Sequence, residues 1–321
     1  MKEEYSEIPE SLRKAYSFRK LLGRGGMSTV WSVNEKGKKK ISYALKIVKK
    51  EVARDPCFIA RFTREVEISK RLNHQGLPKI YASGIAEERP YILMEELEGE
   101  TLSSLLARKR PLPTEMIESI GLELSEILAN VHRQGIVHRD VKPGNVIIPN
   151  KGSLKLLDLG ISRAVQGDTV TRTGTIVGTP FYLAPECCRG ERARSCSDIF
   201  SLGVLLLDCY FEEGIFENSS IVEVLSNRAK GTERLPIFRV KSERDRETLA
   251  QLLRHDPEKR IQNGDEAKLA ILEAPALSQN QRETPTPFRR LFPLLCLLLC
   301  SALLCYDYFI DERVKTSKSA A

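Results

Sequence analysis

The stretch HRDVKPGN at residues 138–145, followed by DLG at 158–160, decides the fold of this chain. The residues between the two segments form two short apolar runs, separated by the turn sequence PNKGS at 149–153. This pattern predicts a β-hairpin. Asn145 begins the first strand of the hairpin and Asp158 follows the second, so their side chains would meet at its open end.

The polar side chains at this end are a candidate metal site. Asp140, Asn145 and Asp158 would converge there. Their oxygen atoms are the hard ligands that Mg²⁺ prefers, usually together with substrate phosphates. An ordinary surface hairpin with a few polar residues at its mouth is the alternative. That alternative gives no reason for Lys142, which stands two residues after Asp140.

The composition is that of a globular protein. The chain has 321 residues, enough for about two domains, and 41% of them are hydrophobic. The formal charge of +7, from 50 basic and 43 acidic residues, is mild and mixed, so we expect a solvated surface and no nucleic-acid partner. The 8 cysteines show no CxxC pair or metal-ligand spacing, which indicates reduced thiols. The charged start MKEEYSEIPE is unlike a secretory signal peptide.

A glycine cluster lies in the first part of the chain. Residues 17–48 alternate apolar and polar side chains, as strands do, and GRGGMSTV at 23–30 lies among them. Glycines leave backbone N–H groups open to an anion such as phosphate, although many β-turns look the same. Lys46 stands in the apolar run that follows, where an unpaired ammonium group would be costly. Phosphate oxygens and a carboxylate would supply its partners.

The carboxylate candidates lie on a helix predicted at 55–74. Asp55 is its expected N-cap and Pro56 its first-turn proline. Glu65 and Glu67 both lie on this helix, and either of them could instead be a surface charge.

Together these motifs resemble those of protein kinases. HRDVKPGN and DLG are similar to the catalytic loop and the metal-binding triplet of that family. The pattern RFTRE resembles bacterial eukaryotic-like Ser/Thr kinases and favours Glu65. The resemblance covers residues 15–272 and implies an α+β, two-lobed protein kinase fold. A small N-lobe with an antiparallel sheet and an αC helix would span about 15–97, and a larger helical C-lobe about 98–272, after an N-terminal extension at 1–14.

The resemblance also implies the catalytic roles. Asp140 would orient the substrate hydroxyl and accept its proton, and Lys142 and Thr179 would act beside it. Asn145 and Asp158 would bind Mg²⁺.

ATP binding is implied in the same way. Lys46, paired with Glu65, would hold the α- and β-phosphates. Met94 would be the gatekeeper of the adenine pocket, and backbone atoms of Glu95 and Leu97 would meet the adenine edge. Each pocket residue could equally be plain core. The implied set is Leu22, Gly23, Arg24, Gly25, Gly26, Met27, Ser28, Thr29, Val30, Ala44, Lys46, Glu65, Met94, Glu95, Leu97 and Ile147.

A threonine-rich stretch follows DLG and ends in GTPFYLAPE at 178–186. It has no periodicity and is typical of a loop, either a solvated connector or an activation segment. Arg139, just before Asp140, offers a bidentate donor for a phosphorylated threonine. By resemblance, Thr171 and Thr173 match the autophosphorylated pair of bacterial kinases.

Two further roles in the C-lobe are implied by the resemblance. The apolar helix predicted at 195–211 carries Asp198, which would hold the backbone of the catalytic loop. Arg260 would form an ion pair with Glu186. The stretch EEGIFENSS at 212–220 departs from the family's Gly-x-x-Pro-Phe pattern, so the substrate-docking surface is left open.

The end of the chain differs in composition. A polar, proline-containing linker at 273–290 precedes an apolar stretch at 291–310, in which Asp307 is the one charged residue. About 20 helical residues span the hydrocarbon core of a bilayer, so the stretch predicts a single transmembrane helix. A buried amphipathic helix is the alternative, but the stretch has no polar stripe. A short tail follows at 311–321.

These observations predict a non-specific Ser/Thr protein kinase that uses ATP and Mg²⁺ and acts on Ser- or Thr-containing proteins. The lipid bilayer would be a partner through residues 291–310, and self-association would serve trans-autophosphorylation. The need for cytosolic ATP and the missing signal peptide predict a single-pass protein of the cell membrane with a cytoplasmic kinase domain. A membrane-tethered pseudokinase that acts as a scaffold is the alternative. The presence of a suitable residue at every catalytic position argues against it.

Overall fold

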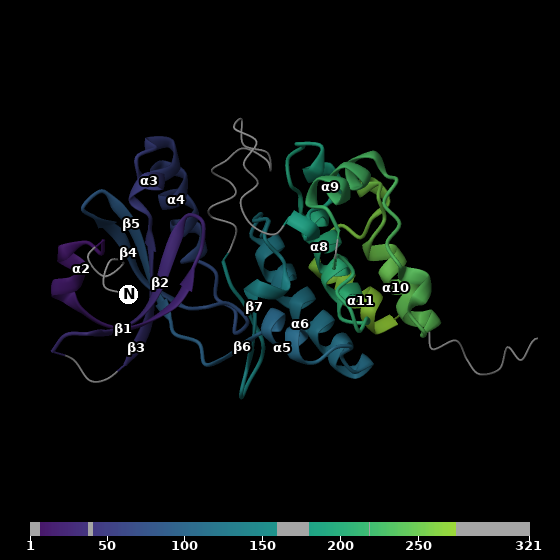
Figure 1. Cartoon of the computed structure of the whole chain (residues 1–321), viewed down its shortest axis with the longest axis horizontal. Helices are drawn as coiled ribbons and strands as arrows, with labels where there is room; N and C mark the ends of the chain where they lie inside the picture. Colours follow the sequence, from purple (N-terminus) through teal and green to yellow (C-terminus); the bar gives the residue numbers. More distant parts are fainter. Residues whose placement is uncertain (1–6, 38–40, 159–179, 218, 274–321) are drawn as a thin grey trace, which may run out of the picture. The chain divides into compact units, whose positions relative to one another are not determined.

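The computed structural model describes residues 7–37, 41–158, 180–217 and 219–273. The predicted α+β, two-lobed architecture is confirmed (Figure 1). The elements of the N-lobe are α2 (Glu10–Ala15), β1 (Tyr16–Arg24), β2 (Ser28–Glu35), β3 (Ser42–Val48), α3 (Lys50–Ala53), α4 (Pro56–Ser69), β4 (Ile80–Ala86) and β5 (Arg89–Glu95).

The C-lobe is mainly helical, with a small three-stranded sheet at its start. Its elements are β6 (Gly99–Thr101), α5 (Leu102–Arg108), α6 (Thr114–Arg133), η1 (Pro143–Asn145), β7 (Val146–Pro149), β8 (Lys155–Leu156), η2 (Pro180–Tyr182), α7 (Pro185–Cys188), α8 (Ser195–Asp208), α9 (Ile221–Lys230), η3 (Ile237–Arg239), α10 (Glu243–Leu252), η4 (Pro257–Lys259) and α11 (Gly264–Glu273).

The N-lobe sheet has the order β1-β2-β3-β5-β4, and all its neighbouring strands are antiparallel. Successive side chains of a strand point to opposite faces. Leu45 and Ile47 of β3 therefore pack on one face of the sheet, in the cluster that contains Leu12 of α2. Val48 packs on the other face, with Phe62 of α4. The sheet thus lies between α2 and α4, as Figure 1 shows.

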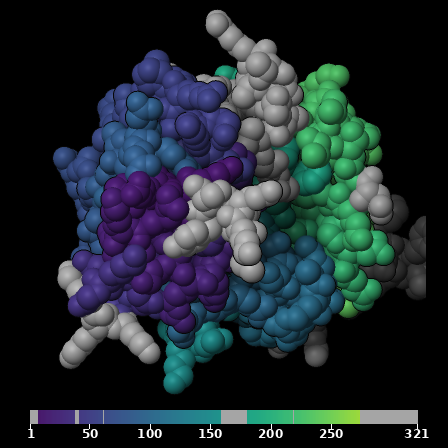
Figure 2. Space-filling model, turned by 60° about the vertical axis from the view of Figure 1, so that its left-hand side comes forward, coloured from purple at the N-terminus to yellow at the C-terminus, as the bar shows by residue number. Residues whose placement is uncertain are grey.

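The N-terminal extension predicted at 1–14 is, in its described part, a component of the N-lobe. Ile8 and Leu12 are both 4% exposed, because α2 covers an apolar face of the sheet. The buried Arg89 ties this segment down: its Nε donates to the Val48 carbonyl at 2.8 Å, and its Nη1 donates to the Glu7 carbonyl. Figure 2 shows α2 and β1 in purple at the surface, beside later elements in blue. The described part of the extension, residues 7–14, therefore packs on the N-lobe sheet.

Helix α4 begins as predicted. The carboxylate of Asp55 accepts a hydrogen bond from the Cys57 backbone N–H at 2.9 Å, and Pro56 is the first helical residue. Helix α6 begins differently, with Pro113 at the N-cap and no side-chain cap. A proline lacks the backbone N–H that a helix start leaves unpaired in any case, so it is tolerated there.

Helix α8 is the centre of the C-lobe core. The helix is strongly apolar, and most of its side chains between Cys196 and Asp208 are buried, on every face of the helix. A helix that is apolar all round is a buried helix. Helix α11 packs closely on α6, because a Cβ at Gly264 would come within 2.2 Å of the Ala129 backbone nitrogen.

In the part of the chain that the structure describes, no helix is long and apolar enough to cross a membrane. The predicted span at 291–310, the tail at 311–321 and all but the first residue of the linker at 273–290 lie outside the described residues.

We expect Leu12→Ala to lower the free energy of unfolding by about 2–5 kcal/mol, because it opens a cavity between α2 and the sheet. Urea unfolding followed by circular dichroism would measure this change. Leu269→Ala is the matched control, since Leu269 is 51% exposed and its truncation should change stability by less than about 0.5 kcal/mol. Equal stability of the two variants would mean that α2 contributes nothing to the lobe.

Candidate active site

The predicted hairpin is formed by β7 and β8. Val146 pairs with Leu156 in antiparallel register. Beyond that pair, the backbone N–H of Leu157 donates to the Asn145 carbonyl at 2.7 Å and closes the open end. Asn145 and Asp158 therefore lie at this end, as predicted from the two apolar runs.

The side chains of the catalytic loop converge on Asp140. Lys142 Nζ lies 2.8 Å from Asp140 Oδ2. Asn145 donates from Nδ2 to the same oxygen at 2.7 Å and to the Asp140 carbonyl at 2.8 Å. These contacts explain the presence of Lys142, which a plain surface hairpin does not. The charge of Lys142 and the amide of Asn145 together hold the Asp140 carboxylate in place.

The backbone of this loop is held from α8. The Asp198 carboxylate is 1% exposed and accepts hydrogen bonds from the N–H groups of His138 and Arg139, both at 2.7 Å. Its third partner is His132 Nε2 at 2.9 Å. Sequence reasoning anticipated the role of Asp198 and missed His132, which lies in the last turn of α6.

The His138 ring links the catalytic loop to the hairpin. Its Nδ1 accepts from the Asp140 N–H at 3.3 Å, so Nε2 carries the proton and donates to the Leu157 carbonyl at 3.1 Å. His138 is fully buried, and this burial lowers the pKa of the imidazole. The ring is therefore neutral at physiological pH and acts as a fixed spacer between the two segments.

Lys46 is placed differently from the prediction. It is 7% exposed, and its Nζ lies 2.5 Å from Asp158 Oδ1, whereas the predicted partner was Glu65. Glu65 instead lies 3.4 Å from Nη1 of Arg139. A buried ammonium group needs a carboxylate, and Asp158, whose backbone has a φ of 52°, supplies it. Arg139, which was predicted to receive a phosphothreonine, carries its positive charge beside Glu65.

The glycine-rich turn joins β1 to β2. The N–H of Gly25 donates to the Ser28 carbonyl at 2.9 Å, so the turn is closed by its own backbone. Behind it, the register of the sheet places Val30 opposite Lys46. The glycine-rich turn and Lys46 are therefore connected through the neighbouring strands β2 and β3.

The predicted adenine pocket lies where β3 pairs with β5. Ala44 stands opposite Met94 in this pairing. The Glu95 N–H donates to the Lys79 carbonyl at 2.8 Å, and Glu95 stands opposite Tyr43 in the β3–β5 pairing. The Glu95 carboxylate forms an ion pair with Lys155.

A pocket opens beside Lys46 and Asp158. It is mostly apolar, with the charged pair at one end, which is the usual make-up of a small-molecule site. Its lining residues are Lys46, Ser69, Leu72, Leu77, Pro78, Ile80, Ile92, Met94, Leu156 and Asp158. Met94, the predicted gatekeeper, lies on its wall.

The residues present fit a magnesium ion only in part. Among the described residues no group of three His, Cys, Asp or Glu side chains is arranged for a metal. Asp158 offers a carboxylate, and Asn145 offers its amide oxygen, because its NH₂ group donates to Asp140. Two such ligands suit Mg²⁺, which keeps several waters and shares phosphate oxygens with a substrate.

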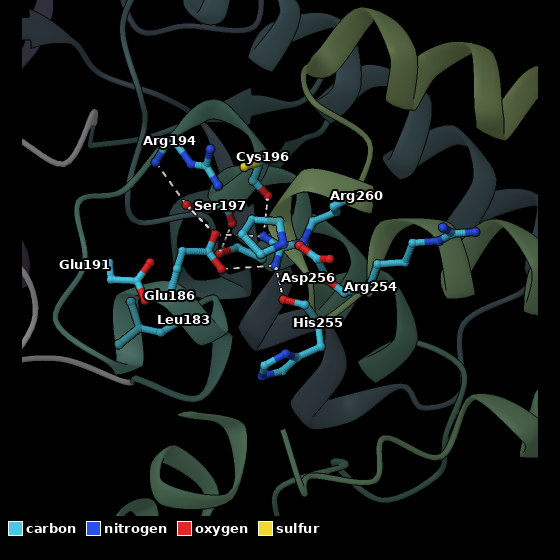
Figure 3. A network of polar contacts seen from close by, with 12 residues as sticks. Leu183, Glu186, Glu191, Arg194, Cys196, Ser197, Arg254, His255, Asp256 and Arg260 are labelled. Carbon is cyan, nitrogen blue, oxygen red and sulfur yellow. Dashed lines mark hydrogen bonds and ion pairs between the residues drawn. The ribbon is translucent and has the colours of Figure 1, made fainter. Parts of the chain in front are cut away.

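The predicted pair of Arg260 and Glu186 is confirmed (Figure 3). The two side chains are 3% and 1% exposed, and two hydrogen bonds of 2.8 and 3.0 Å join them. The Ser197 hydroxyl donates to Glu186 at 2.7 Å, and Arg260 also donates to the Cys196 carbonyl at 2.9 Å. Burial favours a raised pKa for Glu186, but the hydrogen bonds and charge of Arg260 outweigh it and lower that pKa.

Three predicted residues, Thr171, Thr173 and Thr179, lie outside the described residues. Their proposed roles stay predictions.

The chain is similar in sequence to known protein kinases. Residues 16–270 match the protein kinase domain family. The probable serine/threonine-protein kinase SCO3848 of Streptomyces coelicolor is 35% identical over 83% of this chain and 40% of its own length. Serine/threonine-protein kinase PknB of Mycobacterium tuberculosis is 37% identical over 67% of this chain and 35% of its own length. The chain thus spans 40% or less of the length of these relatives.

Solved structures show the same fold. The kinase domain of PknI from Mycobacterium tuberculosis superimposes with a TM-score of 0.64 at 24% identity, over 81% of this chain and 96% of that chain. Rad53 1-466 in complex with AMP-PNP has a TM-score of 0.65 at 26% identity, over 83% of this chain and 66% of that chain.

We expect Arg260→Leu to lower the free energy of unfolding by about 3–5 kcal/mol at neutral pH, because it leaves the Glu186 carboxylate buried without its partner. Because the pKa of Glu186 is lowered by folding, the pair stabilises the protein above the unfolded pKa, and that stability is lost as the pH falls through the folded pKa.

Urea unfolding between about pH 6 and pH 3 would measure this loss. The double variant Glu186→Leu/Arg260→Leu is the control, and its stability should depend less steeply on acid than that of the native chain. Identical acid profiles would contradict the assignment of this pair as a source of pH-dependent stability.

Proposed function

The chain belongs to the protein kinase family, and from this premise we propose that it is a Ser/Thr protein kinase that transfers the γ-phosphate of ATP to serine and threonine hydroxyls of proteins. One observation carries the proposal: Lys142 and Asn145 both contact the carboxylate of Asp140 at the mouth of the β7–β8 hairpin. The names of the related Ser/Thr kinases from Streptomyces and Mycobacterium support the choice of substrate hydroxyl.

The chemistry follows from how Asp140 is held. A hydroxyl placed against its carboxylate is oriented and can give up its proton, and Lys142 would offset the charge that develops beside it. Phosphoryl transfer demands little covalent chemistry from the protein, so positioning and charge stabilisation supply most of the rate. The anchoring of His138 and Arg139 to Asp198 provides that positioning, because it fixes the backbone on which Asp140 stands.

The nucleotide would be held between the lobes by Lys46 and Asp158. When bound, ATP supplies the phosphoryl group and Mg²⁺ offsets its charge. Lys46 is then available to the α- and β-phosphates, and Asp158 with the amide oxygen of Asn145 to the metal. This use requires Lys46 to exchange Asp158 for phosphate, with Glu65 as its further partner. The 2.5 Å pair of Lys46 and Asp158 supports the proposal, since both groups already face one pocket.

We expect Lys46→Met to abolish phosphoryl transfer from radiolabelled ATP to myelin basic protein, with a loss of at least about 100-fold in kcat. The fold should persist, because the substitution removes a charge that serves the ligand and keeps the volume of the side chain. Lys70→Met is the matched control, since Lys70 forms only an exposed pair with Glu67, and it should keep native activity.

Mass spectrometry of the same proteins tests autophosphorylation. Native chain made in a heterologous host should carry phosphate on Thr171 or Thr173, and the Lys46→Met chain should carry none. Near-normal kcat in the Lys46→Met variant would overturn the kinase proposal and leave the scaffold alternative.

We further propose that the kinase is tethered to the cell membrane by one helix at 291–310, with its catalytic domain in the cytoplasm where ATP is present. The apolar composition of this stretch supports the tether. Arg289 and Arg290 precede it and would add about 1 kcal/mol each of attraction to anionic headgroups. Confinement to one surface raises the local kinase concentration, so self-association and trans-autophosphorylation would be faster than in solution.

Fractionation of cells tests the tether. The full chain should sediment with membranes and resist carbonate extraction, because about 20 apolar residues span the hydrocarbon core. A chain that ends at residue 287 should be soluble and still phosphorylate myelin basic protein. If the full chain stays in the soluble fraction, residues 291–310 are a core or partner-binding helix instead.

A further inference from the structure

An arginine that no motif predicts is among the most buried side chains of the C-lobe. Arg228 of α9 is 1% exposed. Its Nε and Nη2 donate to the two carboxylate oxygens of Glu233 at 2.6 and 2.7 Å, which is a bidentate pair. Its guanidinium also lies over the rings of Phe200 and Phe216, 5.4 Å from each centroid.

The turn after α9 makes this pair possible. Gly231 ends the helix with a φ of 73°, a left-handed conformation that favours glycine. The chain therefore reverses, and the N–H of Glu233 donates to the Asn227 carbonyl at 3.2 Å. This reversal brings the Glu233 carboxylate back beside the guanidinium.

The remaining donor of Arg228 reaches a different segment. Its Nη1 donates to the Leu183 carbonyl at 2.9 Å and also to the Phe181 carbonyl. Phe181 in turn stacks on Phe216, with centroids 4.9 Å apart and an interplanar angle of 8°. Arg228 therefore holds two alternate carbonyls of residues 180–183, which we name the 180–183 loop.

The other side of the 180–183 loop is held by α8. The Ser201 hydroxyl donates to the Tyr182 carbonyl at 2.7 Å, and the Tyr182 hydroxyl donates to Asp208 at 3.1 Å. Asp198, which holds the catalytic loop, stands three residues before Ser201, or about 4.5 Å along the helix axis. One rigid helix thus sets the distance between the backbone that carries Asp140 and the 180–183 loop.

We propose that Arg228 is a positioning residue for the protein substrate: it fixes the 180–183 loop as the wall against which the acceptor polypeptide lies when its hydroxyl reaches Asp140. The proposal rests on the proposed function and extends it to the acceptor side of the site. Asp198 holds the catalytic loop and Ser201 holds the 180–183 loop within one turn of α8, whereas the pocket of Lys46 and Asp158 lies at other elements.

The chemistry of the residue favours this role over simple packing. An apolar side chain would fill the same space without the cost of burying a charge. A planar guanidinium, however, can bind a carboxylate with two donors and still reach two carbonyls with a third nitrogen, and no other side chain does this. Arg228 uses this geometry to join α9, its turn and the 180–183 loop.

The test compares Michaelis constants for two substrates in the full-length chain. In the double variant Arg228→Met/Glu233→Gln both charges are removed, so neither is left buried without a partner. We expect the KM for myelin basic protein to rise about 10- to 100-fold, since loss of positioning costs this much. The KM for ATP should stay within about twofold of the native value, because the nucleotide groups are untouched.

Three further variants make the result decisive. Arg228→Lys keeps the charge but not the fork and should give an intermediate KM for the acceptor. Arg244→Met is the matched control, because Arg244 of α10 also contacts a glutamate, Glu118, and a backbone carbonyl, that of Ile271. The KM values of this variant for myelin basic protein and for ATP should both be native. If the double variant does not fold, Ser201→Ala removes the opposite anchor without touching a charge and should raise the acceptor KM alone.

Two outcomes would overturn the proposal. Folded Arg228→Met/Glu233→Gln protein with native KM for myelin basic protein would mean that Arg228 only packs the lobe. An equal rise in both KM values would mean a general loss of structure. Failure of the proposed function is distinguishable from either outcome, because it would show as no phosphoryl transfer by the native chain.

Discussion

The carboxylate of Asp198 is buried in the middle of the C-lobe and accepts hydrogen bonds from two consecutive backbone N–H groups of the catalytic loop. A buried carboxylate is tolerated only when donors surround it, and His132 provides a further one. The loop needs this support, because Arg139 stands at a φ of 67°, which is uncommon for a residue with a side chain. The position of Asp140 therefore depends on a buried residue of another helix.

Helix α8 holds further segments of the C-lobe in the same way. Its apolar residues bury it, and its few polar residues each hold a segment of chain: Ser197 holds Glu186, and Ser201 holds Tyr182. Because these positions lie on one rigid helix, the segments they hold have fixed distances from one another. The buried arginines Arg228 and Arg260 lie on the aromatic ring of Phe200 from the same helix.

The charged groups around Lys46 illustrate how close alternative pairings lie in such a site. The ammonium group meets Asp158, and Glu65 meets Arg139, although the motifs alone indicate a pair of Lys46 with Glu65. Each of these carboxylates satisfies a cation that would otherwise be costly to bury. A motif identifies which charges share a site, whereas the pairing among them is decided by backbone geometry, here the left-handed conformation of Asp158.

The amino-acid sequence by itself determined the family and its two lobes, through motifs that resemble those of protein kinases. It also determined the β7–β8 hairpin, because local apolar periodicity and turn residues specify short elements and their register. Only the tertiary structure decided the partner of Lys46, the place of α2 on the N-lobe sheet and the contacts of His132 and Arg228. These contacts join residues far apart in the chain, such as Arg228 and Leu183. No local pattern encodes them, since they depend on how packed helices bring buried polar groups within reach of a partner.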